Sequence, residues 1–154
     1  MRNIEKDVYK DIWMQSQDHA HCLAWLMLII STCDDQGRFE MHPSRLRARL
    51  FFGDPKITDD YIKSVINDFV SAKKVVQYEV DGKLYCQIVN WWKYQQKSSH
   101  MTVSKFPAPK NWIDRFYYTG KGRKPIKSLY WEEGLAGFVD PDLLPDKSKP
   151  PVNP

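Results

Sequence analysis

The strongest constraint on this chain is a change of hydrophobic period near residue 73, from that of a helix to that of a strand. Between residues 58 and 72, apolar side chains recur at the i, i+3, i+4, i+7 and i+8 positions of an amphipathic helix, as Ile62, Val65, Ile66, Phe69 and Val70. Residues 75–80 and 84–89 are instead rich in β-branched and aromatic residues. A helix followed at once by two strands predicts a mixed α+β fold.

The ends of these elements carry their own signals. Thr58 is a good N-cap for the helix, and the acidic residues Asp59 and Asp60 suit the positive end of its dipole. Between the two strands, Asp81-Gly82 is typical of a type I′ hairpin turn. That turn would pair Val80 with Lys83 and place Tyr78 opposite Tyr85.

Four further elements are expected before residue 58. The apolar residues at positions 4, 8, 12 and 13 predict a short first helix, and the run over 22–33 predicts a buried central helix with Ser16 as its N-cap and Gly37 beyond its end. Residues 38–41 form a short strand candidate. Residues 44–51 predict a small helix on whose outer face Arg45 and Arg49 lie four residues apart.

The order helix, strand, helix, turn, helix, hairpin is that of a winged helix–turn–helix domain, here over residues 4–96. The helices 44–51 and 58–72 would form the helix–turn–helix pair, and the hairpin would be a two-stranded wing. We expect residues 97–139 to form a basic, aromatic extension packed on or near the wing, with one or two helical turns over 111–118. The proline-rich tail, 140–154, is expected to be disordered.

Charge is segregated along the chain. Residues 1–92 carry twelve basic and thirteen acidic residues, whereas residues 93–127 carry nine basic residues and one acid, Asp114, for a net +8. A basic block of this density favours a polyanionic partner, although a solvated linker has the same composition. Its aromatic residues could stack on bases or pack back onto the preceding domain, and the sequence leaves both readings open.

Several functional classes are disfavoured. Cys22, Cys33 and Cys86 are scattered and odd in number, which favours reduced thiols in a cytoplasm-like compartment. The neighbouring His19 and His21 match no common zinc spacing, so neither a metal nor another cofactor is expected. The chain has no Walker loop, H-E-x-x-H or G-x-S-x-G motif, so it is not expected to be an enzyme. No apolar run is long enough for a membrane span.

Several stretches resemble a known family. They are Asp35-Gln36-Gly37-Arg38-Phe39, Leu46–Phe51, Tyr78-Glu79-Val80-Asp81-Gly82-Lys83, and Ile88-Val89-Asn90-Trp91-Trp92-Lys93-Tyr94-Gln95. Together they look like the N-terminal winged-helix domain of bacteriophage replication-initiation proteins, the replisome organisers. Phe106-Pro107-Ala108-Pro109, Trp112 and Gly120-Lys121-Gly122 are similar to a block that often follows that domain.

The resemblance implies a protein of the bacterial host cytoplasm that binds origin DNA through the winged helix, and whose relatives recruit a helicase or its loader through a later domain. Two features depart from the family. Ala72-Lys73-Lys74 stands where a glycine is usual, and few residues follow the basic block. We therefore expect either a truncated initiator or a short regulator.

On a winged helix, the exposed face of helix 58–72 would enter the major groove. We expect Lys63, Ser64 and Asn67 to read base edges. The residues expected to hold phosphates are Arg45, Arg47, Arg49, Lys56, Lys83, Lys121, Arg123 and Lys124.

The partner would be double-stranded DNA, with a host or phage replication protein as a further partner. The alternative is a non-enzymatic phage protein-interaction module that inhibits or adapts a host factor, because acidic residues share the surface of helix 58–72. A homodimer through the first helix or the aromatic tail also stays open.

Overall fold

The computed structural model describes residues 6–95, 102–114 and 137–138, and within them the predicted α+β class is confirmed. The helical elements are η1 Lys6–Lys10, α1 Ile12–Gln15, α2 His19–Met27, the π-helical turn η2 Leu28–Thr32, α3 Pro43–Leu50, α4 Asp59–Ser71 and α5 Trp91–Tyr94. The strands are β1 Arg38–Glu40, β2 Val75–Val80, β3 Lys83–Ile88, β4 Trp112–Ile113 and β5 Gly137–Phe138.

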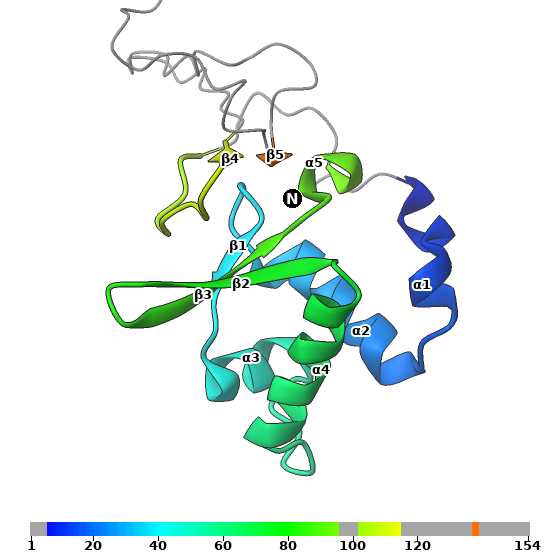
Figure 1. The fold of residues 1–154 in the computed structure, drawn as a ribbon. Coiled ribbons are helices and arrows are strands. Elements are labelled where there is room, and N and C mark those ends of the chain that lie inside the picture. Colours follow the sequence, from blue (N-terminus) through cyan, green and yellow to red (C-terminus); the bar gives the residue numbers. More distant parts are fainter. Residues whose placement is uncertain (1–5, 96–101, 115–136, 139–154) are drawn as a thin grey trace, which may run out of the picture.

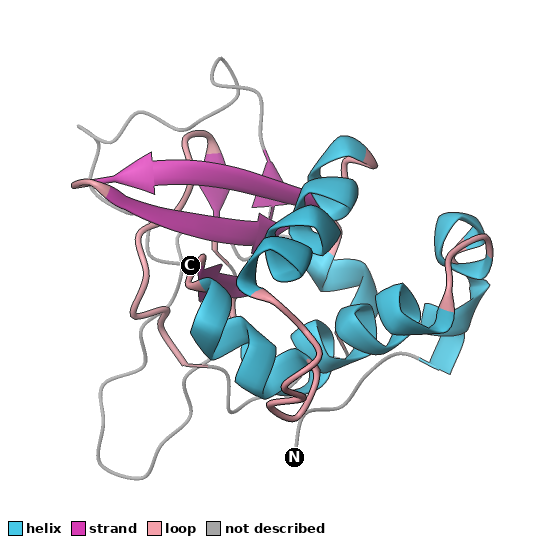
Figure 2. Cartoon of the chain, turned by 90° about the horizontal axis from the view of Figure 1, so that it is seen from below, coloured by secondary structure: helices cyan, strands magenta, loops and turns pink. Residues whose placement is uncertain are grey.

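The strands form two antiparallel sheets. In the larger one the order is β1-β3-β2, so β1 pairs with the second strand of the hairpin, and β4 pairs with β5 in a separate two-stranded ladder. Helices α2, α3 and α4 lie on one side of the larger sheet, and α5, β4 and β5 lie on the other side (Figure 1). The β2–β3 hairpin extends beyond the helices in both views (Figures 1 and 2).

The helix and hairpin on either side of residue 73 form as the sequence predicts. The Thr58 side chain caps α4 by accepting a hydrogen bond from the backbone N–H of Tyr61 at 3.1 Å. In the hairpin, Val80 pairs with Lys83 and Tyr78 with Tyr85. Both turn residues, Asp81 and Gly82, have positive φ, as a type I′ turn requires.

The link between α4 and β2 forms without the glycine that the resembling family usually has there. Lys73 itself adopts the left-handed conformation, with φ 57°. The backbone N–H of Lys74 then reaches back to the carbonyl of Phe69, which closes the end of the helix. The helix therefore ends sharply, at the energetic cost of a non-glycine residue with positive φ.

The two faces of the larger sheet are buried by different parts of the chain. Alternation along the strands places Phe39, Cys86, Ile88 and Val75 toward the helices, and all four are nearly or fully buried. The opposite face carries Arg38, Gln87, Tyr85 and Tyr78. It is covered by residues 102–114, which we call the strap and which hydrogen-bond to Arg38 and Tyr78.

The N-terminal region differs from the sequence prediction. The expected single first helix is two short pieces, η1 and α1, because Asp11 has an extended conformation and caps α1 through the backbone N–H of Met14. The N-cap of α2 is Asp18, which accepts from the N–H of His21, and Ser16 instead ends α1. Both aspartates capture an N–H that the helix leaves unpaired.

The central helix is also less buried than its apolar sequence predicts. Trp25, Leu28 and Ile29 are buried in the core, but Leu23 and Ile30 remain 39% and 49% exposed. Trp25 packs against Phe69 of α4, with the ring centroids 5.2 Å apart. The fold has no further layer over the Leu23 side of α2 within the described residues.

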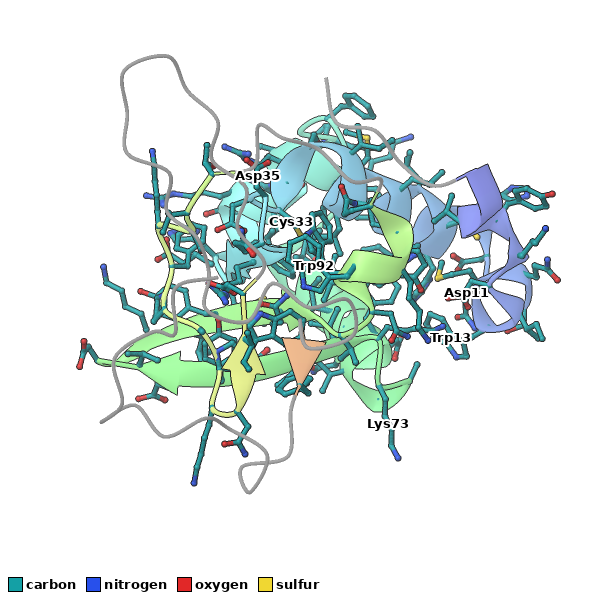
Figure 3. All side chains as sticks on the ribbon, turned by 90° about the horizontal axis from the view of Figure 1, so that it is seen from above. Asp11, Trp13, Cys33, Asp35, Lys73 and Trp92 are labelled. Atoms are coloured by element: carbon teal, nitrogen blue, oxygen red, sulfur yellow. The ribbon has the colours of Figure 1, made fainter. Side chains whose placement is uncertain are left out.

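The Asp11 carboxylate ties the N-terminus to two distant elements. Its Oδ2 accepts hydrogen bonds from Lys74 Nζ, after α4, and from the Tyr94 hydroxyl of α5 at 3.0 Å. These contacts hold the pKa of Asp11 below its usual value even though burial acts in the opposite direction. Figure 3 shows Asp11 and Trp13 on the first turns of the chain.

The region after residue 96 corrects one prediction and leaves others untested. Residues 112–113 form a strand rather than part of a helix, and Asn111 before them has φ 61°, which is incompatible with a continuing helix. The rest of the basic extension and the proline-rich tail lie outside the described residues. The expected domain boundaries therefore stay predictions.

Candidate nucleic-acid interface

The outer face of α4 presents the three side chains predicted to read bases. Ile62, Val65, Ile66 and Phe69 are fully buried against the rest of the core. That orientation leaves Lys63, Ser64 and Asn67 exposed on the opposite face. Their exposure confirms the periodicity argument, while their role stays a prediction.

These three side chains differ in what they offer a ligand. The Ser64 hydroxyl donates to the carbonyl of Tyr61 at 2.7 Å, so its lone pairs are left to accept. Asn67 makes no side-chain hydrogen bond to the described residues and retains both donors and an acceptor. Lys63 lies 3.6 Å from Asp60 and is exposed over about half of its side chain.

Each acidic residue of α4 has a basic partner. Asp59 lies 3.9 Å from Arg47 of α3, Asp60 pairs with Lys63, and Asp68 Oδ2 lies 2.9 Å from His21 Nε2. Each carboxylate is at least half exposed, so every pair is weak and can exchange its partner for solvent or a ligand. The acidic charge of α4 is therefore only partly offset by these basic groups.

His21 connects α2 to α4. Its Nδ1 lies 2.8 Å from Asp18 Oδ1, and its Nε2 faces Asp68. Burial alone would lower the pKa of His21, but the two carboxylates outweigh that effect and raise it above its usual value. Protonation of His21 thus neutralises one of the carboxylates on α4.

The predicted phosphate-holding residues do not form one patch. Arg47 donates to the carbonyl of Ile57 at 3.4 Å, beside the start of α4, and the exposed Lys56 lies in the same loop. Lys83 is exposed at the end of the hairpin. Arg45 and Arg49 lie on another side of α3, toward the strap. Lys121, Arg123 and Lys124 lie outside the described residues.

The most elaborate polar network in the described residues was not predicted. Arg38 of β1 is 1% exposed, and its guanidinium forms a bidentate pair with both carboxylate oxygens of Asp114 in the strap. Arg38 Nε also donates to Gln87 Oε1 at 2.9 Å, and Gln87 in turn donates to the carbonyl of Gln36. Burial raises the pKa of Asp114, and the Arg38 guanidinium opposes that shift.

A second set of contacts fastens the start of the strap to the turn before β1. Asp35 Oδ2 accepts hydrogen bonds from both the backbone N–H and the hydroxyl of Thr102, at 2.9 and 2.8 Å. The Ser104 hydroxyl donates to Asp34. Figure 3 labels Asp35 at this turn, next to the strap. Together with Arg38–Asp114, these bonds anchor both ends of the strap.

The strap's role could have been suspected from two residues. Asp114 is the one acid in the basic block, and Arg38 is the one Lys or Arg between residues 11 and 44. An isolated opposite charge in each segment is compatible with a buried pair. Because the two residues are 76 positions apart, no local sequence pattern could indicate that they pair.

The aromatic residues of the extension are only partly described. Trp112 is nearly buried and packs edge-to-face on Phe138, with ring centroids 4.9 Å apart. Phe106 lies against Tyr85, and the Tyr78 hydroxyl donates to the carbonyl of Pro107 at 2.6 Å. Burial raises the pKa of Tyr78. These aromatics pack onto the sheet, whereas Phe116, Tyr117, Tyr118 and Tyr130 are outside the described residues.

Two features are absent from the described residues. These residues contain no group of three or more His, Cys, Asp or Glu side chains placed to hold a metal ion. None of the helices described is both long and apolar enough to cross a bilayer. Comparisons of the chain with protein-family models, with curated proteins and with solved structures found no match.

Proposed function

We propose that this chain is a phage-type winged helix–turn–helix protein that binds duplex DNA in replication initiation or transcription control. The observation that carries the proposal is the combination of element order and strand order. Helix, strand, two helices and a hairpin follow one another, and β1 adds to the hairpin in the order β1-β3-β2. On this arrangement α3 and α4 are the helix–turn–helix pair and β2–β3 is the wing.

The exposed face of α4 would enter the major groove. Asn67 can make a bidentate contact with adenine, and Ser64, whose hydroxyl hydrogen is occupied, would accept from a base amino group. Lys63 would exchange Asp60 for a guanine edge or a phosphate. These contacts would supply whatever sequence preference the protein has.

Phosphate contacts would come from the elements around α4. Arg47 and Lys56 border its N-terminus, and Lys83 lies at the end of the hairpin that projects beyond the helices (Figure 2). The basic segment 93–127, with Lys121, Arg123 and Lys124, would add most of the sequence-independent affinity, because residues 1–92 are nearly neutral.

A second candidate function is supported by the carboxylates of α4. Three acids, Asp59, Asp60 and Asp68, share a helix with one lysine, and the Asp60 side chain is 93% exposed. Such a surface suits a basic protein partner better than a phosphate backbone. In that case the same face would inhibit or adapt a replication protein of the host or phage.

Salt-dependent binding to a mixed-sequence duplex separates these candidates. We expect wild-type affinity to fall linearly with salt on a double-logarithmic plot, with a slope of about −0.9 for each phosphate contact. Lys121→Gln/Arg123→Gln should make that slope shallower by about two units. Lys63→Ala/Asn67→Ala should weaken binding by about tenfold, since it removes groove contacts.

The controls use exposed residues away from α4. Lys10→Gln on η1 removes one charge outside the basic segment and should leave the slope unchanged. DNA binding by α4 is rejected if the Lys63/Asn67 double variant binds like the wild type. The protein-interaction candidate is favoured if no duplex binds above background at low salt.

A further inference from the structure

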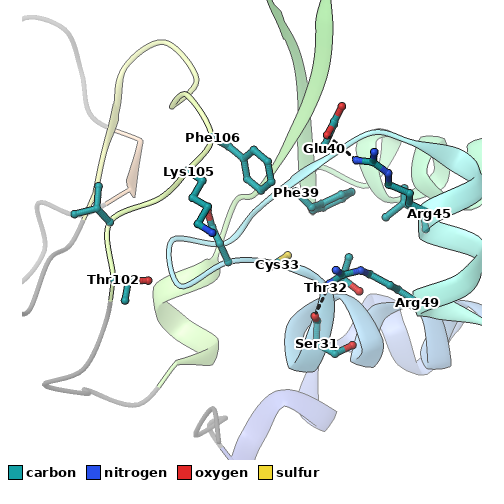
Figure 4. A pocket seen from close by; sticks show the side chains of 13 residues that line it. Ser31, Thr32, Cys33, Phe39, Glu40, Arg45, Arg49, Thr102, Lys105 and Phe106 are labelled. Carbon is teal, nitrogen blue, oxygen red and sulfur yellow. Dashed lines mark hydrogen bonds and ion pairs between the residues drawn. The ribbon is translucent and has the colours of Figure 1, made fainter.

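A cavity of about 380 Å³ lies between η2, β1, α3 and the first part of the strap. Figure 4 shows Arg45 and Arg49 of α3 entering it from one side, and Lys105 and Phe106 of the strap bordering it from the other. The cavity therefore depends on two segments about 60 positions apart in the sequence. It is separate from the exposed face of α4.

Two of the three cations of the cavity, Arg49 and Lys105, have no acidic partner among the described residues. Arg49 Nη1 donates to the carbonyl of Ser31 at 3.3 Å, which orients its guanidinium and leaves its other N–H groups free. Arg45 Nη1 lies 3.5 Å from Glu40 Oε2, and its side chain is 72% exposed. Lys105 makes no ion pair or side-chain hydrogen bond with the described residues.

The neutral and acidic groups of the cavity are already engaged by the protein. The hydroxyls of Ser31 and Thr32 both donate to the carbonyl of Met27, and the Thr102 hydroxyl donates to Asp35. Asp34 accepts hydrogen bonds at both oxygens, from two backbone N–H groups and from Ser104. The donors left for a ligand thus belong to cations, so the cavity is suited to an anion.

Size and lining narrow the class of anion. A volume of about 380 Å³ lies at the low end of small-molecule sites and is far more than one phosphate group needs. Phe106 is half-buried at the border of the cavity, where a ring could stack beside the cations. We propose that this cavity binds one nucleoside phosphate, with Arg49 and Lys105 holding the phosphate and Phe106 contacting the base.

The ligand could be a free mononucleotide or the 5′-phosphorylated end of a DNA strand, because both present the same chemistry. The site needs the strap in place, and the bonds from Asp34 and Asp35 hold Thr102 and Ser104 beside it. Binding of a nucleoside phosphate in this cavity does not depend on DNA binding by α4. Its failure and the failure of the proposed function are therefore distinguishable.

Binding to the full chain tests the proposal with four probes. They are deoxyadenosine monophosphate, a 5′-phosphorylated single-stranded tetranucleotide, the same tetranucleotide without phosphate, and inorganic phosphate. We expect deoxyadenosine monophosphate to bind about tenfold more tightly than inorganic phosphate, or the phosphorylated tetranucleotide to bind about tenfold more tightly than the unphosphorylated one. Preference for the monophosphate identifies a free nucleotide as the source, and preference for the tetranucleotide identifies a strand end.

The variants Arg49→Gln and Lys105→Gln should each weaken that binding by about tenfold, because each removes a charge-assisted contact. Lys10→Gln, on the exposed surface of η1, should leave it unchanged. Both pocket residues are exposed, so circular dichroism should show an unchanged fold. The proposal is overturned if inorganic phosphate binds as well as the nucleotides, if no probe binds at millimolar concentration, or if Arg49→Gln and Lys105→Gln have no effect.

Discussion

Individual residues on α4 show how a helix with three acids could still approach DNA. Asp59, Asp60 and Asp68 each lie beside a basic group of the protein, and each remains at least half exposed. Phosphates would compete with these carboxylates for the same cations. If α4 binds DNA as proposed, these acids would reduce its affinity without abolishing it, so removing one of them should strengthen binding.

Replacing Asp60 with asparagine should raise duplex affinity. The change frees Lys63 and removes a charge that repels phosphate, so we expect binding about threefold tighter at low salt. Fluorescence anisotropy with a labelled duplex measures this. Asp60→Glu keeps the charge and should bind like the wild type; an Asn variant that binds no better than the Glu variant would count against a phosphate near α4.

His21 predicts a pH dependence of stability. Because its pKa is raised in the folded state, the folded protein holds the proton more tightly than the unfolded chain does. The resulting stabilisation is complete below about pH 6.5, the pKa of an unperturbed histidine, and is lost as the pH rises through the higher pKa of the folded state. With partners this exposed, the effect is about 0.5 kcal/mol.

Urea unfolding across pH 5.5 to 8.5 measures this effect. The free energy of unfolding of the wild type should fall more over that range than that of His21→Gln, which lacks the titrating group. His19→Gln, on the exposed first turn of α2, is the matched control and should behave like the wild type. Parallel pH profiles for wild type and His21→Gln would refute the assignment.

For individual side chains, the sequence predicts exposure that follows from helical periodicity, but it does not predict contacts with residues far away in the chain. The exposure of Lys63, Ser64 and Asn67 follows from the helical spacing of the apolar residues alone. The His21–Asp68 contact joins residues 47 positions apart, so no local pattern could indicate it.

Among the elements, the strap decides how the sheet is buried. The strands β2 and β3 do not alternate cleanly between apolar and polar residues, because both faces of the sheet are covered toward one end. Gln87 and Arg38 are buried on the strap side, where they bond to each other and Arg38 also bonds to the strap. The strand positions were predictable from composition, and packing of the extension near the wing was expected, but the buried contacts of Arg38 and Gln87 were not.

A double-mutant cycle tests how much the Arg38–Asp114 pair contributes to the free energy of unfolding. Asp114→Asn leaves a buried guanidinium without its counter-charge and should lower the free energy of unfolding by about 3 kcal/mol. Arg38→Met alone leaves the Asp114 carboxylate without its counter-charge and should cost a similar amount, whereas Arg38→Met/Asp114→Asn removes both charges and should recover much of the loss.

Chemical denaturation measures the cycle, and hydrogen exchange at residues 102–114 shows whether the strap has loosened. Lys110→Gln, on the exposed surface of the strap, is the control and should be neutral. Additive losses in the double variant would show that the two side chains act independently.

Replacing either of two glycines with similar backbone angles by alanine should lower the free energy of unfolding by very different amounts. Gly37 has φ 80°, and a Cβ there would lie 2.5 Å from Cγ of the buried Trp91, whereas Gly82 has φ 75° and open space around it. Gly82→Ala should cost about 1 kcal/mol, from backbone strain alone. Gly37→Ala should cost more, because Trp91 must also move and its bond to the Asp35 carbonyl is disturbed.

Thermal or urea unfolding of the two alanine variants tests the comparison directly. Equal losses would show that the turn before β1 can shift away from Trp91 at no cost. The hairpin glycine was recognisable from its Asp-Gly dipeptide, whereas the close approach of Gly37 to Trp91 needed the fold.

In the whole molecule, basic groups are distributed over several surfaces. Arg47 and Lys56 border α4, Lys83 lies at the end of the hairpin, and Arg45, Arg49 and Lys105 surround the cavity (Figure 4). If α4 reads the major groove as proposed, the near-neutral body would supply specificity and the basic segment of net +8 would supply most of the affinity.

The most direct test of DNA binding through α4 is a titration of the isotope-labelled protein with a mixed-sequence duplex, followed by backbone and side-chain amide chemical shifts. We expect the largest changes at Lys63, Ser64 and the Asn67 side-chain amide, with smaller changes at Lys56 and Lys83. Unchanged α4 signals under conditions where the duplex is bound would contradict the proposal.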